Sequence, residues 1–113
     1  MERMSIEKKG QACILRYSGE LTLEVIDSLK DEIEGYLSGD DCMVLVMDLS
    51  QTVFLDSSGI GFLVHINNRK TTKNKEFYLL APSPQVRKTL NLVKLIDFFH
   101  ILEQEDEIPE GNL

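Results

Sequence analysis

The run from Met43 to Leu49 is apolar at every position except Asp48. Strands that are covered on both faces have such continuous apolar runs, whereas strands with one wet face alternate between apolar and polar residues. The run is far shorter than the roughly 20 apolar residues that span a bilayer as a helix. We therefore expect residues 43–49 to form a central strand of a sheet that the rest of the chain covers.

Segments with strand and helix patterns surround this run. Before it, residues 5–9 and 11–17 predict a hairpin through Gly10, and an apolar stripe from Leu23 to Leu37 predicts a helix with its N-cap at Thr22. After it, the predicted elements are a helix at 57–70, a strand at 76–80, a helix from an N-cap at Ser83 with Pro84 at N1 to about Leu92, a helical turn at 94–97 and a strand at 99–102.

This order, β-β-α-β-α-β-α-β, predicts one α/β domain over residues 1–113 with a mostly parallel central sheet. Residues 50–52 are expected to form a loop, and residues 53–55 to pack their apolar side chains beneath the start of the second helix. The acidic tail, about 103–113, is expected to fray, because chain ends are often poorly ordered.

The charge balance excludes two classes of partner. The chain has 12 Lys and Arg against 19 Asp and Glu, a formal net charge of -7. Binding to nucleic acid or to an anionic membrane surface rests on an excess of Lys and Arg. The first ten residues contain no apolar core of a signal peptide. We therefore expect no nucleic acid, no membrane and a cytoplasmic location.

The two cysteines, Cys13 and Cys42, each lie in or beside an apolar run, and their spacing fits no zinc or redox motif. Free cysteine behaves as a small apolar residue. We expect both to be reduced thiols in the core, with a disulfide between the two strands as the alternative.

The stretch from Asp56 to Gly61 lies where the chain enters the second helix. The first amides of a helix lack partners and form the positive end of its dipole, so this place favours an anion. Asp56 fits the N-cap, and a phosphate could sit on Ser57 or on Ser58. The helix dipole alone does not separate the two serines, and either can be an ordinary helix-start residue. Gly59 and Gly61 allow close approach of a neighbouring element or a partner.

Three segments carry a family resemblance: Ser18-Gly19-Glu20-Leu21, Met47-Asp48-Leu49-Ser50 and Leu55-Asp56-Ser57-Ser58-Gly59-Ile60-Gly61. Together they resemble the STAS domain family and, within it, the stand-alone anti-sigma factor antagonists, over nearly the whole chain. The resemblance implies that Ser57 is phosphorylated by an anti-sigma factor with serine kinase activity. It also implies that the unphosphorylated protein binds this factor and frees a sigma factor, and that a serine phosphatase restores binding.

For this chain, the resemblance places partner binding at Asp56, Ser57, Ser58, Gly59 and Gly61. The family often carries an acid after Gly-Glu-Leu, where this chain has Thr22, a difference that bears on kinase contact or phosphate transfer. The chain has no P-loop, His-Glu-x-x-His or Cys-x-x-Cys sequence, so we expect no cofactor and no metal.

Two alternatives remain open at this point. Ser57 as a catalytic nucleophile is disfavoured, because His65 lies about 12 Å further along the predicted helix and Leu55 occupies the first glycine position of a nucleophile elbow. His100 could approach only through the tertiary fold. The second alternative is a STAS module that serves as an unphosphorylated scaffold in a signalling or transport complex.

Overall fold

The computed structural model describes residues 3–72 and 74–109 and contains one five-stranded sheet in the order β1-β2-β3-β4-β5. Strand β1 runs antiparallel to β2, and the other neighbouring pairs are parallel, which confirms the mostly parallel sheet. The strands are β1 (Met4–Lys9), β2 (Ala12–Leu21), β3 (Val44–Leu55), β4 (Glu76–Leu80) and β5 (Ile101–Leu102).

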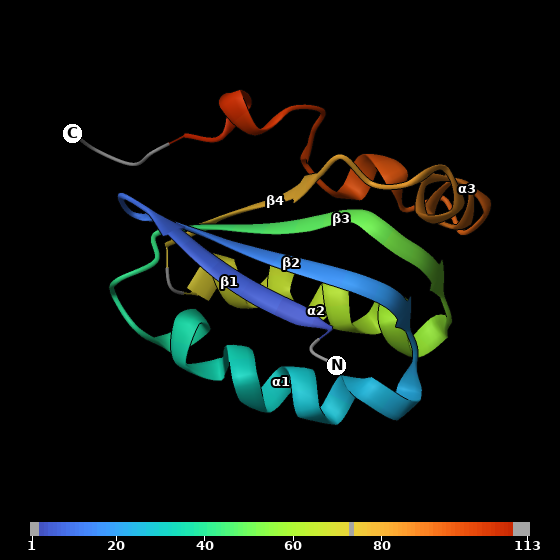
Figure 1. Cartoon of the computed structure of the whole chain (residues 1–113), viewed down its shortest axis with the longest axis horizontal. Helices are drawn as coiled ribbons and strands as arrows, with labels where there is room; N and C mark the ends of the chain where they lie inside the picture. Colours follow the sequence, from blue (N-terminus) through green and yellow to red (C-terminus); the bar gives the residue numbers. More distant parts are fainter. Residues whose placement is uncertain (1–2, 73, 110–113) are drawn as a thin grey trace.

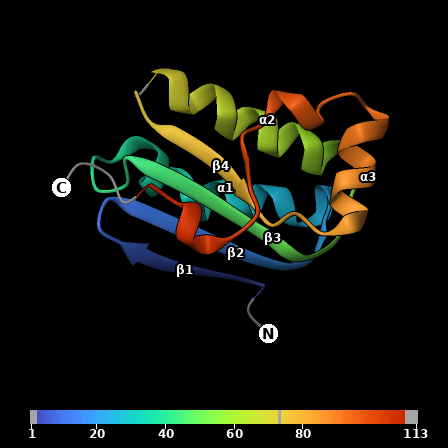
Figure 2. The same cartoon turned by 90° about the horizontal axis from the view of Figure 1, so that it is seen from above.

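The helices are α1 (Leu23–Ser38), α2 (Ser57–Thr72) and α3 (Pro84–Leu92), with 3-10 turns η1 (Ile96–Phe98) and η2 (Glu105–Glu107). Helices α1 and α2 lie side by side on one face of the sheet, and α3 lies near the C-terminal end of β3 (Figures 1 and 2). The predicted cap of α3 is confirmed, since Ser83 Oγ accepts from Val86 N at 3.3 Å. In the described part of the chain, no helix is long and apolar enough to cross a membrane.

The two faces of β2 contribute to two separate apolar clusters, because successive side chains of a strand point to opposite faces of the sheet. Cys13, Leu15 and Tyr17 face the larger cluster beneath α1 and α2. Ala12 and Ile14 face a smaller cluster on the opposite side of the sheet. The other buried members of that smaller cluster are Val44, Val46, Leu80 and Ile108.

The C-terminal segment covers this second face. Ile108 is buried in the smaller cluster, and Glu105 pairs with Lys9 and, at 2.8 Å, with Arg16. Figure 1 shows the segment crossing the side of the sheet opposite α1 and α2. The expectation of a frayed tail is therefore wrong for residues 103–109, because the apolar sheet face needs a cover; residues 110–113 lie outside the described part. We call residues 103–109 the strap.

Strand β3 is longer than predicted and runs through the expected loop at 50–52. Its polar Thr52 is fully buried, and Thr52 Oγ1 donates to Tyr17 O at 3.0 Å. Leu55 is buried as expected, but Val53 and Phe54 are 51% and 48% exposed, so the prediction that they pack inward is wrong. The partner of Thr52 lies on β2, which itself continues to Leu21, and this pairing cannot be seen in a local sequence pattern.

The cysteines form a disulfide, with 5.6 Å between the Cα atoms of Cys13 and Cys42. The expectation of two reduced thiols is therefore wrong. Parallel pairing of Ala12 with Val44 brings the residues that lead into β3 next to the start of β2, and both cysteines are 1% exposed. The sequence shows that each cysteine lies in or beside an apolar run, but it does not show the pairing of β2 with β3 that brings the two together.

Replacing Ile108 by alanine tests the role of the strap. We expect Ile108→Ala to lower the free energy of unfolding by about 2 kcal/mol, because the change removes buried methylene groups and leaves a gap over the sheet. Urea unfolding measures the effect. Leu92→Ala, at a side chain that is 74% exposed, is the control and should stay within about 0.5 kcal/mol of the parent. Equal behaviour of the two variants would show that the strap does not stabilise the fold.

Candidate functional site

The register of the sheet brings the starts of two helices together. Leu21 at the end of β2 pairs with Leu55 at the end of β3. Helix α1 begins two residues after Leu21, and α2 begins two residues after Leu55. Figure 1 accordingly shows the N-terminal ends of α1 and α2 at the same end of the sheet.

The carboxylate of Asp56 connects these two helix starts. Asp56 Oδ1 accepts from Gly59 N at 2.8 Å, which is the N-cap bond predicted for α2. Asp56 Oδ2 accepts from Leu23 N, the first residue of α1, at 3.1 Å. The Asp56 backbone N–H also donates to Leu21 O, at 3.4 Å. One side chain therefore caps two helices and fixes how they sit relative to each other.

Thr22 occupies the predicted N-cap position of α1, but its side chain makes no cap hydrogen bond. The cap of α1 comes instead from Asp56 on another element. The pKa of the Asp56 carboxyl is lowered from its ordinary value of 3.8, chiefly by the hydrogen bond from Gly59 N and also by the bond from Leu23 N. The charged carboxylate is the form that these amides stabilise.

Gly59 allows α2 to approach the end of β2 closely. A Cβ atom at this position would lie 2.2 Å from Leu21 O, a backbone atom that cannot move aside as a side chain could. Gly59 is buried, so its contact is inside the protein. Gly61 is exposed, and a Cβ there would meet nothing within 4 Å.

The surface around this junction combines hydroxyl, acidic and apolar groups. Ser57 is exposed at the first position of α2, and Ser58 is half-buried. Leu23, whose backbone N–H bonds to Asp56, is 68% exposed, and Phe54, two residues before Asp56 in the chain, is 48% exposed. The acids Glu20 and Glu24 are exposed as well: Glu24 follows Leu23 in the chain, and Glu20 pairs with Phe54 between β2 and β3. We call Leu23, Phe54, Asp56, Ser57, Ser58 and Gly61 the junction surface.

His100 does not approach Ser57 in the fold. Its ring packs against Tyr78 of β4, with 6.0 Å between the ring centroids. Tyr78 pairs with Val46, which lies nine residues before Leu55 on β3, roughly 30 Å along the strand. Among residues 3–72 and 74–109, no cluster of His, Cys, Asp and Glu is arranged to hold a metal ion.

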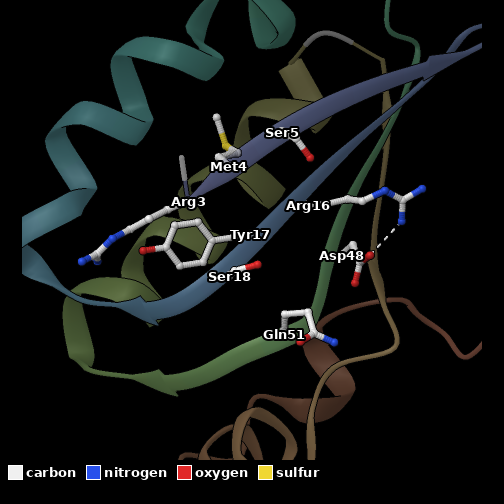
Figure 3. A pocket seen from close by; sticks show the side chains of 8 residues that line it. All are labelled: Arg3, Met4, Ser5, Arg16, Tyr17, Ser18, Asp48 and Gln51. Carbon is white, nitrogen blue, oxygen red and sulfur yellow. Dashed lines mark hydrogen bonds and ion pairs between the residues drawn. The ribbon is translucent and has the colours of Figure 1, made fainter. Parts of the chain in front are cut away.

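A cavity of about 280 Å³ lies beside β1 and β2 (Figure 3). Its lining includes Arg3, Arg16 and Asp48, and the two guanidinium groups point in opposite directions in Figure 3. Arg16 bonds to Asp48 at 2.8 Å, to Glu7 at 2.7 Å and to Glu105 at 2.8 Å. Three carboxylates therefore surround this cation, and the strap supplies one of them. Arg16 holds the fold together rather than presenting a free charge to a ligand.

Sequence reasoning found Asp56, Ser57 and the helix start, but it missed the other half of the junction. The bond to Leu23 and the exposure of Phe54 depend on the pairing of β2 with β3. The sequence signal that comes nearest to showing this is the glycine at position 59, three residues after the capping aspartate.

Two glycine substitutions test the close approach of α2. We expect Gly59→Ala to destabilise the protein by about 1–3 kcal/mol, because the new Cβ would overlap the Leu21 carbonyl. Gly61→Ala is the matched control and should stabilise the protein by about 0.5–1 kcal/mol, since alanine is the better helix former in open space. Urea unfolding midpoints of the two variants measure these effects. Equal shifts of the midpoint would contradict the close contact of Gly59 with the Leu21 carbonyl.

The lowered pKa of Asp56 predicts a pH dependence of stability. A carboxyl with a depressed pKa in the folded state contributes stability above its unfolded value, and this contribution is lost as the pH falls through the folded pKa. We therefore expect the parent to lose more stability than Asp56→Asn between neutral pH and about pH 3. Urea midpoints over this range measure the difference. Parallel pH profiles would show that the charge does not stabilise the helix junction.

Comparisons with known proteins agree with this architecture. An anti-sigma F factor antagonist from Paenibacillus polymyxa is 24% identical over 103 residues, which are 91% of this chain and 88% of that protein. The solved structure of an anti-sigma factor antagonist from Mycobacterium paratuberculosis has a TM-score of 0.80 at 26% identity, covering 92% of this chain and 87% of that one. SpoIIAA in its unphosphorylated form has a TM-score of 0.77 at 21% identity, covering 92% and 91%.

A further structure with this fold, Bacillus SpoIIAA in the phosphorylated form, has a TM-score of 0.72 at 20% identity and covers 92% of this chain and 95% of that chain. The family model of the STAS domain matches residues 3–108, from the start of the sheet to the buried isoleucine of the strap. On this match, the chain belongs to the STAS domain family.

Proposed function

We propose that this protein is an anti-sigma factor antagonist whose binding is controlled by phosphorylation of Ser57. The observation that carries the proposal is the position of Ser57: it is exposed, it opens α2, and it follows the aspartate that caps two helices. The antagonists named among the relatives support the role. A protein of the same fold whose structure was solved in a phosphorylated form supports the control.

The junction favours a phosphate that changes the surface without unfolding the protein. Phosphorylation adds a charge of about -1.5 to -2 at neutral pH. The positive end of the α2 dipole and first-turn amides of α2 stabilise that charge. Asp56 opposes it, because its carboxylate is adjacent and already accepts from Leu23 N and Gly59 N. The stabilisation by the helix amides and the repulsion by Asp56 partly offset each other. We therefore expect the phosphate to change partner binding more than the stability of the fold.

The junction surface suits a protein partner. Leu23 and Phe54 are large apolar side chains that water covers in the free protein, and burying them on association is favourable. Ser57 and Gly61 lie on the exposed side of the α2 start, where a partner approaches. Gly59 supports this surface from beneath through its contact with Leu21 O. A phosphate on Ser57 adds a hydrated, negatively charged group to this surface and disfavours burial of its apolar side chains by a partner.

The partners that follow from this proposal are an anti-sigma factor with serine kinase activity, which binds the unphosphorylated protein, and a serine phosphatase that removes the phosphate. These partners place the protein in the cytoplasm. Thr22 stands where the family often has an acid, and it lies next to Leu23 at the junction. One negative charge fewer at this point lowers the repulsion that an incoming phosphoryl group meets.

The phosphorylation site is tested with the cognate kinase and ATP. We expect a single phosphate, mapped by mass spectrometry to Ser57, that is absent from Ser57→Ala and present in Ser58→Ala. Ser58 is the matched control, because it is the next residue of the same helix turn and is half-buried. Phosphate on Ser58 alone would overturn the site, and phosphate on neither serine would favour the unphosphorylated scaffold.

The position of the binding surface is tested with two glycine-to-arginine changes. We expect Gly61→Arg to weaken binding of the unphosphorylated protein to the anti-sigma factor by about tenfold or more, because the long side chain obstructs the junction surface. Gly35→Arg is the control: this glycine also lies in a helix with nothing within 4 Å of a Cβ, but near the C-terminal end of α1. Full affinity in a folded Gly61→Arg variant would place the partner elsewhere.

A further inference from the structure

We propose that Cys13 and Cys42 form a thiol–disulfide exchange site that reacts with small disulfides such as oxidised glutathione. This inference does not depend on the proposed function, because the pair lies at the other end of β2 and β3 from Ser57. Its basis is the position of the two cysteines in the fold, a cavity that both of them line and a lysine in the same cavity.

The two cysteines differ in how firmly the fold holds them. Cys13 lies within β2 and pairs with Lys8 on one side and with Leu45 on the other. Cys42 lies in the irregular connection between α1 and β3, directly after the exposed Asp40 and Asp41. Irregular surface segments open locally at lower free energy than paired strands. Cys42 is therefore the sulfur that can move away and return while Cys13 stays in place.

A cavity of about 540 Å³ gives a small molecule access to the pair. Both cysteines line it, together with Ile6, Tyr36 and Gly39. The cysteines themselves are 1% exposed, so a reagent reaches the sulfur atoms through the cavity rather than from the open surface. A site of this size admits a small thiol or disulfide and excludes a folded protein.

One lysine and one aspartate, Lys8 and Asp41, line the cavity together with the two cysteines. Lys8 lines the same cavity, and Lys8 Nζ donates to Asp41 O at 2.6 Å, directly beside Cys42 in the chain. The ammonium of Lys8 stabilises a nearby thiolate, which is the form that attacks disulfides, whereas the carboxylate of Asp41 opposes it, so the reactivity of the pair depends on the lysine. The bond from Lys8 also ties β1 to the connection that carries Cys42.

The exchange proceeds in two steps. The thiolate of Cys42 attacks one sulfur of oxidised glutathione; the S–S bond of the reagent breaks, and one glutathione leaves as a thiolate that takes up the proton. Cys13, as its thiolate, then attacks the Cys42 sulfur and displaces the second glutathione in the same way. Two protein thiols and one small disulfide become one protein disulfide and two small thiols. The small disulfide is the only oxidant required.

Oxidation of the pair changes how α1 is held. Cys13 and Cys42 are 29 positions apart, and the chain between them includes the whole of α1. The disulfide closes this loop and limits the freedom of the unfolded chain, which raises stability. Reduction therefore lowers the Tm while the folded structure remains.

The experiment exposes the fully reduced, folded protein to defined ratios of oxidised and reduced glutathione and follows the intact mass. We expect the parent to lose two hydrogens without retaining glutathione, and excess dithiothreitol to reverse this with an unchanged circular dichroism spectrum. Cys13→Ser should trap glutathione on Cys42, and Cys42→Ser should react several-fold more slowly. Lys8→Met should slow oxidation of the pair several-fold.

Three results would overturn the proposal. The first is a parent that stays reduced in oxidised glutathione, and the second is a parent that ends with glutathione on each cysteine. The third is a disulfide that resists dithiothreitol until the protein unfolds, because it would then be a permanent crosslink. Equal trapping rates in Cys13→Ser and Cys42→Ser would overturn the assignment of Cys42 as the attacking sulfur.

Discussion

The carboxylate of Asp56, shared between the first amides of two helices, is the interaction on which the functional end of the molecule depends. Its two oxygens accept from Gly59 N and Leu23 N, so the starts of α1 and α2 cannot shift independently. The arrangement requires the ends of β2 and β3 to be in register and α2 to approach Leu21 O without a side chain at position 59. Ser57, the next residue in the chain, opens α2 and is exposed.

Away from this junction, a disulfide and the strap hold other parts of the fold in place. The disulfide between Cys13 and Cys42 ties the far end of β2 to the connection that follows α1, so α1 is fixed near both of its ends. The strap closes the second sheet face through Ile108 and through the pairing of Glu105 with Arg16. A domain this small has little core to spare; the disulfide strengthens the core beneath α1 and α2, and the strap covers the opposite face of the sheet. The STAS match spans the sheet, the helices and the strap together.

The sequence predicted the features that depend on neighbouring residues. The apolar run at 43–49, the apolar stripe of α1 and the Ser83 cap of α3 identified the elements and their order. It did not predict the contacts made through strand register, namely the burial of Thr52 against Tyr17 O, the disulfide and the second cap at Leu23. The strap was missed for a related reason: an acidic tail covers this apolar face because Ile108 packs on it and because Lys9 and Arg16 pair with Glu105, contacts between residues far apart in the chain.

We propose that a phosphate on Ser57 weakens binding of the partner by changing the protein surface, while the folded structure stays the same. It is tested most directly by the dissociation constant of the anti-sigma factor for stoichiometrically Ser57-phosphorylated protein, compared with the unphosphorylated protein. We expect phosphorylation to weaken binding by about tenfold or more, because a charged group then enters the interface, while the circular dichroism spectrum stays unchanged. Equal affinity of the two forms, or loss of affinity that accompanies unfolding, would contradict it.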